Sequence, residues 1–187
     1  MNWQCIILIS EVTSVRNDYI FGQVNKIIDK YCTRDPFELL DAMGVIMVFS
    51  RKYSADGLKG YCLLANRTTY VVINDFLWEE EQRIVAMHEL GHIILHRHIL
   101  QVAPMRDFEL YGMKNRAEYE ANLFAADTLI SDQVVEELAK NEYMDYFCMC
   151  KTLGISPELM SFKLYSLIHR GHNYKLPQDI KSGFLKS

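Results

Sequence analysis

Three short segments rich in β-branched and aromatic residues stand between stretches that are patterned as helix. These segments are Val45–Phe49, Gly60–Leu64 and Thr69–Ile73, and turn-forming residues separate them. We therefore expect a small antiparallel or mixed sheet. Because helical stretches precede and follow these strands instead of alternating with them, the order of elements predicts an α+β fold. In this fold a small, mainly antiparallel sheet packs on a helical core that continues into a helical C-terminal part.

Apolar periodicity and helix-boundary residues predict the helices before the sheet. Tyr19–Tyr31 repeats apolar residues at helical spacing and predicts a first helix, which follows an N-terminal extension of residues 1–18. Asp35 and Pro36 suit the N-cap and the first position of a second, short helix.

The chain after the sheet is predominantly helical. Either Asn74 or Asp75 offers a cap for the first helix of this region, which carries glutamates in its first turn. The predicted elements are, in order, a helix from about Trp78 to His98, a loop over Ile99–Lys114, a helix over Arg116–Leu129 and a helical tail over residues 132–187.

Length and composition limit the kind of protein that this chain can be. With 187 residues it is sized for one domain, and we treat residues 1–187 as a single unit. The formal net charge of −4 provides no basic surface for phosphates, so we expect no direct nucleic-acid binding. The apolar runs are too short to span a bilayer, and the first residues do not have the pattern of a signal peptide. The odd, scattered set of five cysteines suits reduced thiols, so we expect a cytoplasmic protein.

The motif His88-Glu89-Leu90-Gly91-His92 lies in the middle of a predicted helix. Residues four apart lie on one helix face, so both imidazoles can bind a single zinc ion at about 2.0–2.1 Å. Glu89 is rotated by about 100° from His88 and can reach the metal-bound water without being a ligand. Since zinc lowers the pKa of its water to about 7, Glu89 can act as the general base and then protonate the leaving amine. Gly91 leaves room for a sheet or a substrate backbone. The apolar surroundings disfavour a chance occurrence of the motif.

A catalytic zinc site needs a third protein ligand, and two glutamates of the next helix compete for this role. Glu118 shares a face with Asn122 and Ala125, and such a face of small residues allows close helix packing. Glu120 shares its face with larger apolar residues. We therefore favour Glu118 as the ligand, with Asn122 one turn along as the hydrogen-bond partner of a ligand histidine.

The two motifs together, HELGHIILH over His88–His96 and E-x-x-A-N-x-F-A-A over Glu118–Ala126, resemble the ImmA/IrrE family of metallopeptidases. The resemblance covers roughly residues 19 to 131. It implies a gluzincin-like zinc endopeptidase with a zincin-like core, in which His88, His92 and Glu118 bind one zinc ion and Glu89 is the catalytic base. It also implies a role in mobile elements or stress responses, where cleavage of a helix-turn-helix repressor relieves transcriptional silencing. The chain departs from the family in having Ile130-Ser131 where a Met-Pro step is common.

Several further residues have two interpretations each. His96 is either a third histidine that steadies the site or a partly exposed residue favoured near a helix C-terminus. Tyr111 is one of several tyrosines that are candidates for stabilising the oxyanion. The third predicted strand is either a core strand or an exposed edge that pairs with an extended substrate. The substrate-binding residues on that edge would be Tyr70, Val71, Val72 and Ile73.

Two other classes of function compete with the peptidase. A regulatory module would keep the zinc fold and sequester its protein partner without cleaving it. Direct DNA binding through the C-terminal helices is disfavoured by the acidic charge balance.

Overall fold

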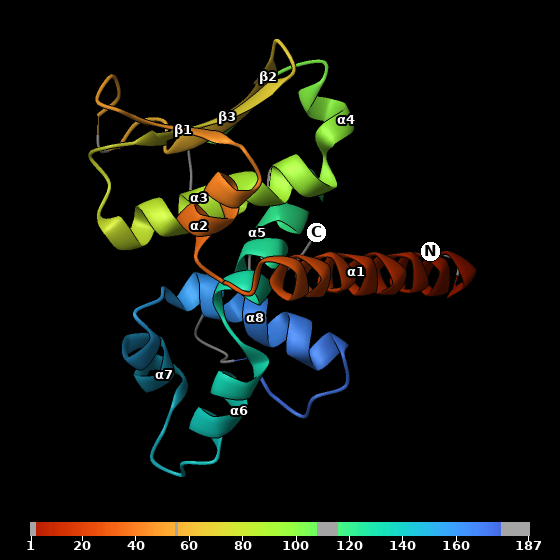
Figure 1. Cartoon of the computed structure of the whole chain (residues 1–187). Helices are drawn as coiled ribbons and strands as arrows, with labels where there is room; N and C mark the ends of the chain where they lie inside the picture. The colour runs from red at the N-terminus through yellow and green to blue at the C-terminus, as the bar shows by residue number, and fades with distance from the viewer. Residues whose placement is uncertain (1–2, 55, 108–115, 177–187) are drawn as a thin grey trace.

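The computed structural model describes residues 3–54, 56–107 and 116–176. Helices precede and follow a group of consecutive strands, which confirms the α+β prediction (Figure 1). The elements are, in chain order, α1 (Trp3–Tyr31), α2 (Pro36–Ala42), β1 (Ile46–Ser50), β2 (Gly60–Ala65), β3 (Thr68–Asn74), α3 (Glu79–Leu95), α4 (Arg97–Leu100), β4 (Met105–Asp107), α5 (Arg116–Leu129), α6 (Asp132–Ala139), α7 (Tyr146–Leu153) and α8 (Pro157–His169).

The strands form one four-stranded sheet in the order β1-β3-β2-β4. β1 is parallel to β3, whereas β2 is antiparallel to both β3 and β4, so the sheet is mainly antiparallel, as predicted. The register places Gly60 of β2 opposite Ile73 on one side and Asp107 on the other. β3 is therefore an interior strand, and within the part of the chain that the structure describes β1 and β4 are the edges. β4 falls in the segment that the sequence predicted as a loop.

The helix α3 lies between the sheet and the helix α5 (Figure 1). Side chains of β3, such as Val71 and Ile73, share one apolar core with Val85 and Leu90 of α3. On its other side α3 packs on α5, which also contacts α1 and α8. A helix covered in this way is buried nearly all round, and a site on it is held rigidly by both layers. Within the described residues no helix is both long and apolar enough to cross a membrane.

The N-terminal helix is longer than the sequence predicted. α1 begins at Trp3 instead of Tyr19, so residues 3–18 are the first part of this helix and not a separate extension. The following boundary agrees with the prediction, because Asp35 caps α2 by accepting hydrogen bonds from the amides of Phe37 and Glu38 at 2.9 and 3.0 Å.

The start of α3 also differs from the prediction. Its N-cap is Trp78, whose backbone amide donates to the carboxylate of Glu81 at 3.2 Å. Asn74 and Asp75 are therefore not the cap. Asn74 is buried and holds the preceding loop instead, since its side-chain amide donates to the backbone oxygens of Ser54 and Leu58 at 2.8 and 3.0 Å.

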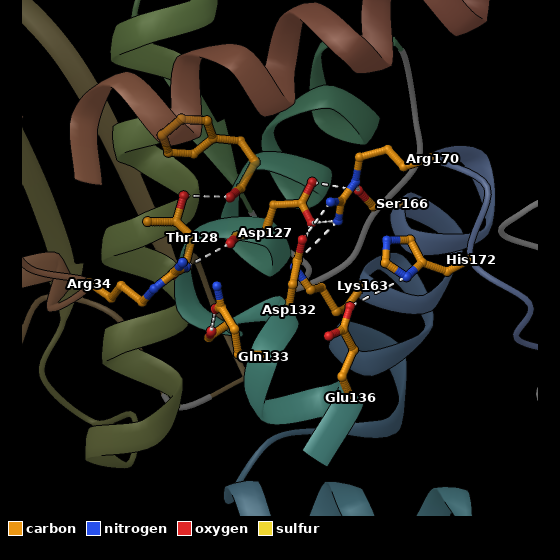
Figure 2. Close-up of polar contacts among 12 residues, drawn as sticks. Arg34, Asp127, Thr128, Asp132, Gln133, Glu136, Lys163, Ser166, Arg170 and His172 are labelled. Carbon is orange, nitrogen blue, oxygen red and sulfur yellow. Dashed lines mark hydrogen bonds and ion pairs between the residues drawn. The ribbon is translucent and has the colours of Figure 1, made fainter. Parts of the chain in front are cut away.

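A buried network of ion pairs joins the C-terminal helices to α5 (Figure 2). The fully buried Lys163 of α8 donates to Asp127 of α5 at 2.9 Å and also to Asp132, the first residue of α6. Arg170 donates to both carboxylate oxygens of Asp132, at 2.5 and 3.1 Å. Burial alone would raise the pKa of Asp132, but the hydrogen bonds from Arg170 and Lys163 outweigh it and lower that pKa. The network fixes three helices relative to one another.

Candidate metal centre

The close packing of α5 on α3 depends on Gly91. A Cβ atom at this position would lie 3.2 Å from Cα of Ala121 and 3.2 Å from the ring of Phe124. The missing side chain thus admits the backbone of α5, and not a sheet or a substrate as the sequence had indicated. Because the two helices touch here, the first turn of α5 comes within reach of the histidines of α3.

Three predicted metal-binding residues meet at this contact. Nε2 of His88 lies 3.0 Å from Nε2 of His92, and the Glu118 carboxylate oxygens lie 3.3 Å from the first and 3.7 Å from the second. Ligands at zinc-bond lengths in a tetrahedron are separated by about 3.3 Å, so the three atoms already have the spacing of a bound set. His92 is fully buried, whereas the side chains of His88 and Glu118 are 8% and 14% exposed. Solvent therefore reaches the site at His88 and Glu118, and not at His92.

The hydrogen bonding of His88 shows that the group suits a cation. Its Nδ1 lies 2.9 Å from Oδ1 of Asn122, the contact that the sequence predicted for Asn122. Since an amide oxygen only accepts, the ring hydrogen lies on Nδ1 and Nε2 is an acceptor. That acceptor faces a second imidazole nitrogen and a carboxylate, and all three groups can donate an electron pair to one cation. Two imidazoles and one carboxylate are a ligand set for zinc, and also for manganese or iron.

Glu89 is fully buried between α3 and the sheet. It lies beside Gly60 of β2, where a Cβ atom would be 3.2 Å from Oε1 of Glu89 and 2.4 Å from Cγ1 of Val85. The glycine therefore leaves the space that the carboxyl group occupies. Gly60 thus places β2 beside this carboxyl group.

Substitution of Gly60 by alanine tests this packing. We expect a loss of about 1–3 kcal/mol in the free energy of unfolding, because the added methyl group overlaps Val85 and crowds Glu89. Gly22→Ala is the matched control, since no atom lies within 4 Å of the position of its Cβ. Thermal denaturation of both variants measures the effect. Equal melting temperatures for the two would contradict the crowding at Gly60.

His96 is buried beside the metal-binding group, so the interpretation as a partly exposed residue is wrong. Its Nδ1 lies 3.0 Å from Nδ1 of His92, and its Nε2 lies 3.0 Å from Oε2 of Glu120. Glu120 is thus placed one layer behind the metal-binding atoms, where Arg16 and Arg116 each donate to it at 2.7 Å. Burial alone would raise the pKa of Glu120, but hydrogen bonds from His96, Arg16 and Arg116 lower it to about 2.

The structure does not support the predicted substrate strand. β3 is paired on both sides, so its backbone cannot take up an extended substrate, and the edge-strand interpretation is wrong. Its residues serve the sheet and the core: Val71, Val72 and Ile73 are buried, and Tyr70 pairs with Ile46 and Leu63. Tyr111, the candidate for oxyanion stabilisation, lies outside the described residues.

A sheet packed on a helix that carries HExxH, with a glutamate from the next helix at the two histidines, defines the class of metallopeptidases to which the chain is similar. Residues 45–165 match the family model described as the IrrE N-terminal-like domain. The chain belongs to the ImmA/IrrE family of metallopeptidases.

Two relatives illustrate this membership. The chain is 31% identical to "Uncharacterized immunity region protein 2" of Bacillus phage phi105 over 124 residues, which are 66% of this chain and 76% of the phage protein. It is 25% identical to "Metallopeptidase ImmA" of Bacillus subtilis (strain 168) over 127 residues, which are 67% of this chain and 72% of that protein.

Proposed function

We propose that this protein is a zinc-dependent endopeptidase that cuts a specific protein partner, a helix-turn-helix transcriptional repressor. The observation that carries the proposal is the convergence of His88 and His92 of α3 with Glu118 of α5 at the spacing of zinc ligands. Glu89 follows His88 directly on α3. Membership of a metallopeptidase family supports the reaction class. The phage relative, which is named for an immunity region, supports a regulatory partner.

Each residue of the site has its own role in the proposed reaction. His88, His92 and Glu118 would hold one zinc ion, and Asn122 would keep His88 in the tautomer that binds it. A bound zinc ion supplies Lewis-acid activation of water and of the scissile carbonyl. Glu89 takes the proton of the attacking water and passes it to the nitrogen of the leaving amine. The low-dielectric surroundings of this buried carboxyl group strengthen its interaction with charge that develops nearby.

The substrate segment would bind in an extended form along β4. Among the described residues this strand is a sheet edge, and its neighbour β2 carries Gly60, which borders Glu89. An extended peptide that adds to such an edge gains main-chain hydrogen bonds and presents a backbone amide to the adjacent site.

The test is to incubate the purified, zinc-loaded protein with the product of its neighbouring gene, as the candidate repressor, and to follow that product by mass spectrometry. We expect defined fragments that disappear with a chelator and return when zinc is added. A repressor that stays intact with the zinc-loaded protein would contradict the peptidase. If the intact repressor were bound in a stable complex, the protein would be a sequestering module.

A further inference from the structure

We propose that the N-terminal helix α1 positions the metal-binding His92 through a chain of contacts from Arg16 to Glu120 to His96. The inference rests on the proposed metal site and extends it to a helix outside the residues that match the family model, which begin at residue 45. Arg16 is a positioning residue, because it acts on His92 through Glu120 and His96.

The chain of contacts is continuous from α1 to His92. Nη2 of Arg16 donates to Oε2 of Glu120 at 2.7 Å, and the same oxygen lies 3.0 Å from Nε2 of His96. Nδ1 of His96 lies 3.0 Å from Nδ1 of His92. Glu120, His96 and His92 are 3%, 3% and 0% exposed, so water competes little with these contacts.

The position of the hydrogen in each of these contacts follows from Glu120, whose carboxylate can only accept. The Nε2 of His96 that faces Glu120 therefore carries the hydrogen. In the neutral ring Nδ1 of His96 is then an acceptor, and the hydrogen between the two rings belongs to Nδ1 of His92. Nε2 of His92, the atom at the metal-binding group, is thereby left as the electron-pair donor that a metal requires.

Arg16 matters because it comes from a different element. Arg116, the second cation on Glu120, is a neighbour on α5 itself and its side chain is 63% exposed, whereas the side chain of Arg16 is 32% exposed and reaches across from α1. Arg116 lies on the same helix as Glu120, so its contact does not hold the Glu120 carboxylate relative to another element. The contact from α1 fixes the oxygen that accepts from His96, and so the angle of the imidazole ring of His92.

The experiment measures cobalt binding instead of activity. Cobalt(II) is titrated into the metal-free full-length protein, and both the dissociation constant and the visible ligand-field spectrum are recorded. Substitution of residues that hold metal ligands in place weakens metal binding by about 10–100-fold. We expect Arg16→Met to raise the dissociation constant for cobalt about 10-fold, at the lower end of that range. The spectrum should change as well, because the ring of His92 is no longer held at one angle. Arg16→Lys keeps the cation and should restore most of the affinity.

The control is Lys26→Met, which removes the same charge from an exposed position on the same helix. Glu120→Gln provides a second variant, which we expect to weaken cobalt binding by 10-fold or more. Wild-type affinity and spectrum in Arg16→Met and Glu120→Gln would overturn the inference, even if their metal-free forms melted at lower temperature. In that case the wild-type protein would still bind cobalt, so the result would not contradict the proposed peptidase. A wild-type protein that binds no cobalt would overturn the metal site and the inference with it.

Discussion

Replacing Glu89 by glutamine should abolish proton transfer and leave metal binding intact. We expect the rate of repressor cleavage to fall by about 10²–10⁴-fold, the usual contribution of a general acid–base residue. Glutamine has nearly the same shape as glutamate, so the side chain still fits the space beside Gly60. The three metal-binding residues are unchanged, and the zinc content should stay at the wild-type level. Single-turnover cleavage and elemental analysis of the same preparation measure the two effects separately.

Glu80→Gln is the matched control for this experiment, because Glu80 is an exposed glutamate in the first turn of the same helix. Its cleavage rate should equal that of the wild type. If the Glu89→Gln protein cleaved the repressor at the wild-type rate, Glu89 would not be the base. If that variant lost its zinc as well as its activity, the assignment of separate roles to Glu89 and to the metal-binding residues would be wrong.

Replacing Lys163 by methionine should strongly lower the free energy of unfolding. Its ammonium group is fully buried between Asp127 and Asp132, so removing it leaves two carboxylates with one cation fewer (Figure 2). Breaking such a buried pair costs about 3–5 kcal/mol. We expect about 3 kcal/mol, since Arg170 remains close to both carboxylates. For a chain of this size this corresponds to a fall of about 6–12 °C in melting temperature.

Lys151→Met, at an exposed position on α7, serves as the control for the loss of one positive charge. Its melting temperature should change by no more than about 1–2 °C, as for most surface substitutions. A shift in Lys163→Met as small as that of the control would show that the network contributes nothing to the docking of the C-terminal helices on α5.

The elements that the sequence predicted well are those with local signals. Arg116–Leu129 is a helix over the predicted residues, and the cap at Asp35 lies where the sequence placed it. Two of the missed features, β4 and the first part of α1, have no local signal. β4 contains no β-branched residue and is a strand because it pairs with β2. The first part of α1 includes the run Cys5–Ile9, which is apolar without helical spacing and so gave no amphipathic pattern.

The grouping of site residues was predictable to the extent that it depends on spacing along one helix. His88 and His92 meet because residues four apart share a face. Glu118 meets them because Gly91 of α3 lets α5 pack closely at Ala121, one turn along from Glu118. The contact between Arg16 and Glu120 was not predictable, because the two residues are 104 positions apart in sequence and meet only in the folded chain. The error about β3 has the same origin, since the edge of a sheet is set by strand order and not by composition.

The central claim is that His88, His92 and Glu118 bind one divalent cation. Elemental analysis after reconstitution with zinc and removal of excess metal tests it directly. We expect one zinc ion per chain in the wild type and in Glu89→Gln, and a large loss of zinc in both His92→Ala and Glu118→Ala. A wild-type protein that retains no zinc, or a Glu118→Ala protein that retains it with wild-type affinity, would contradict the proposed metal site.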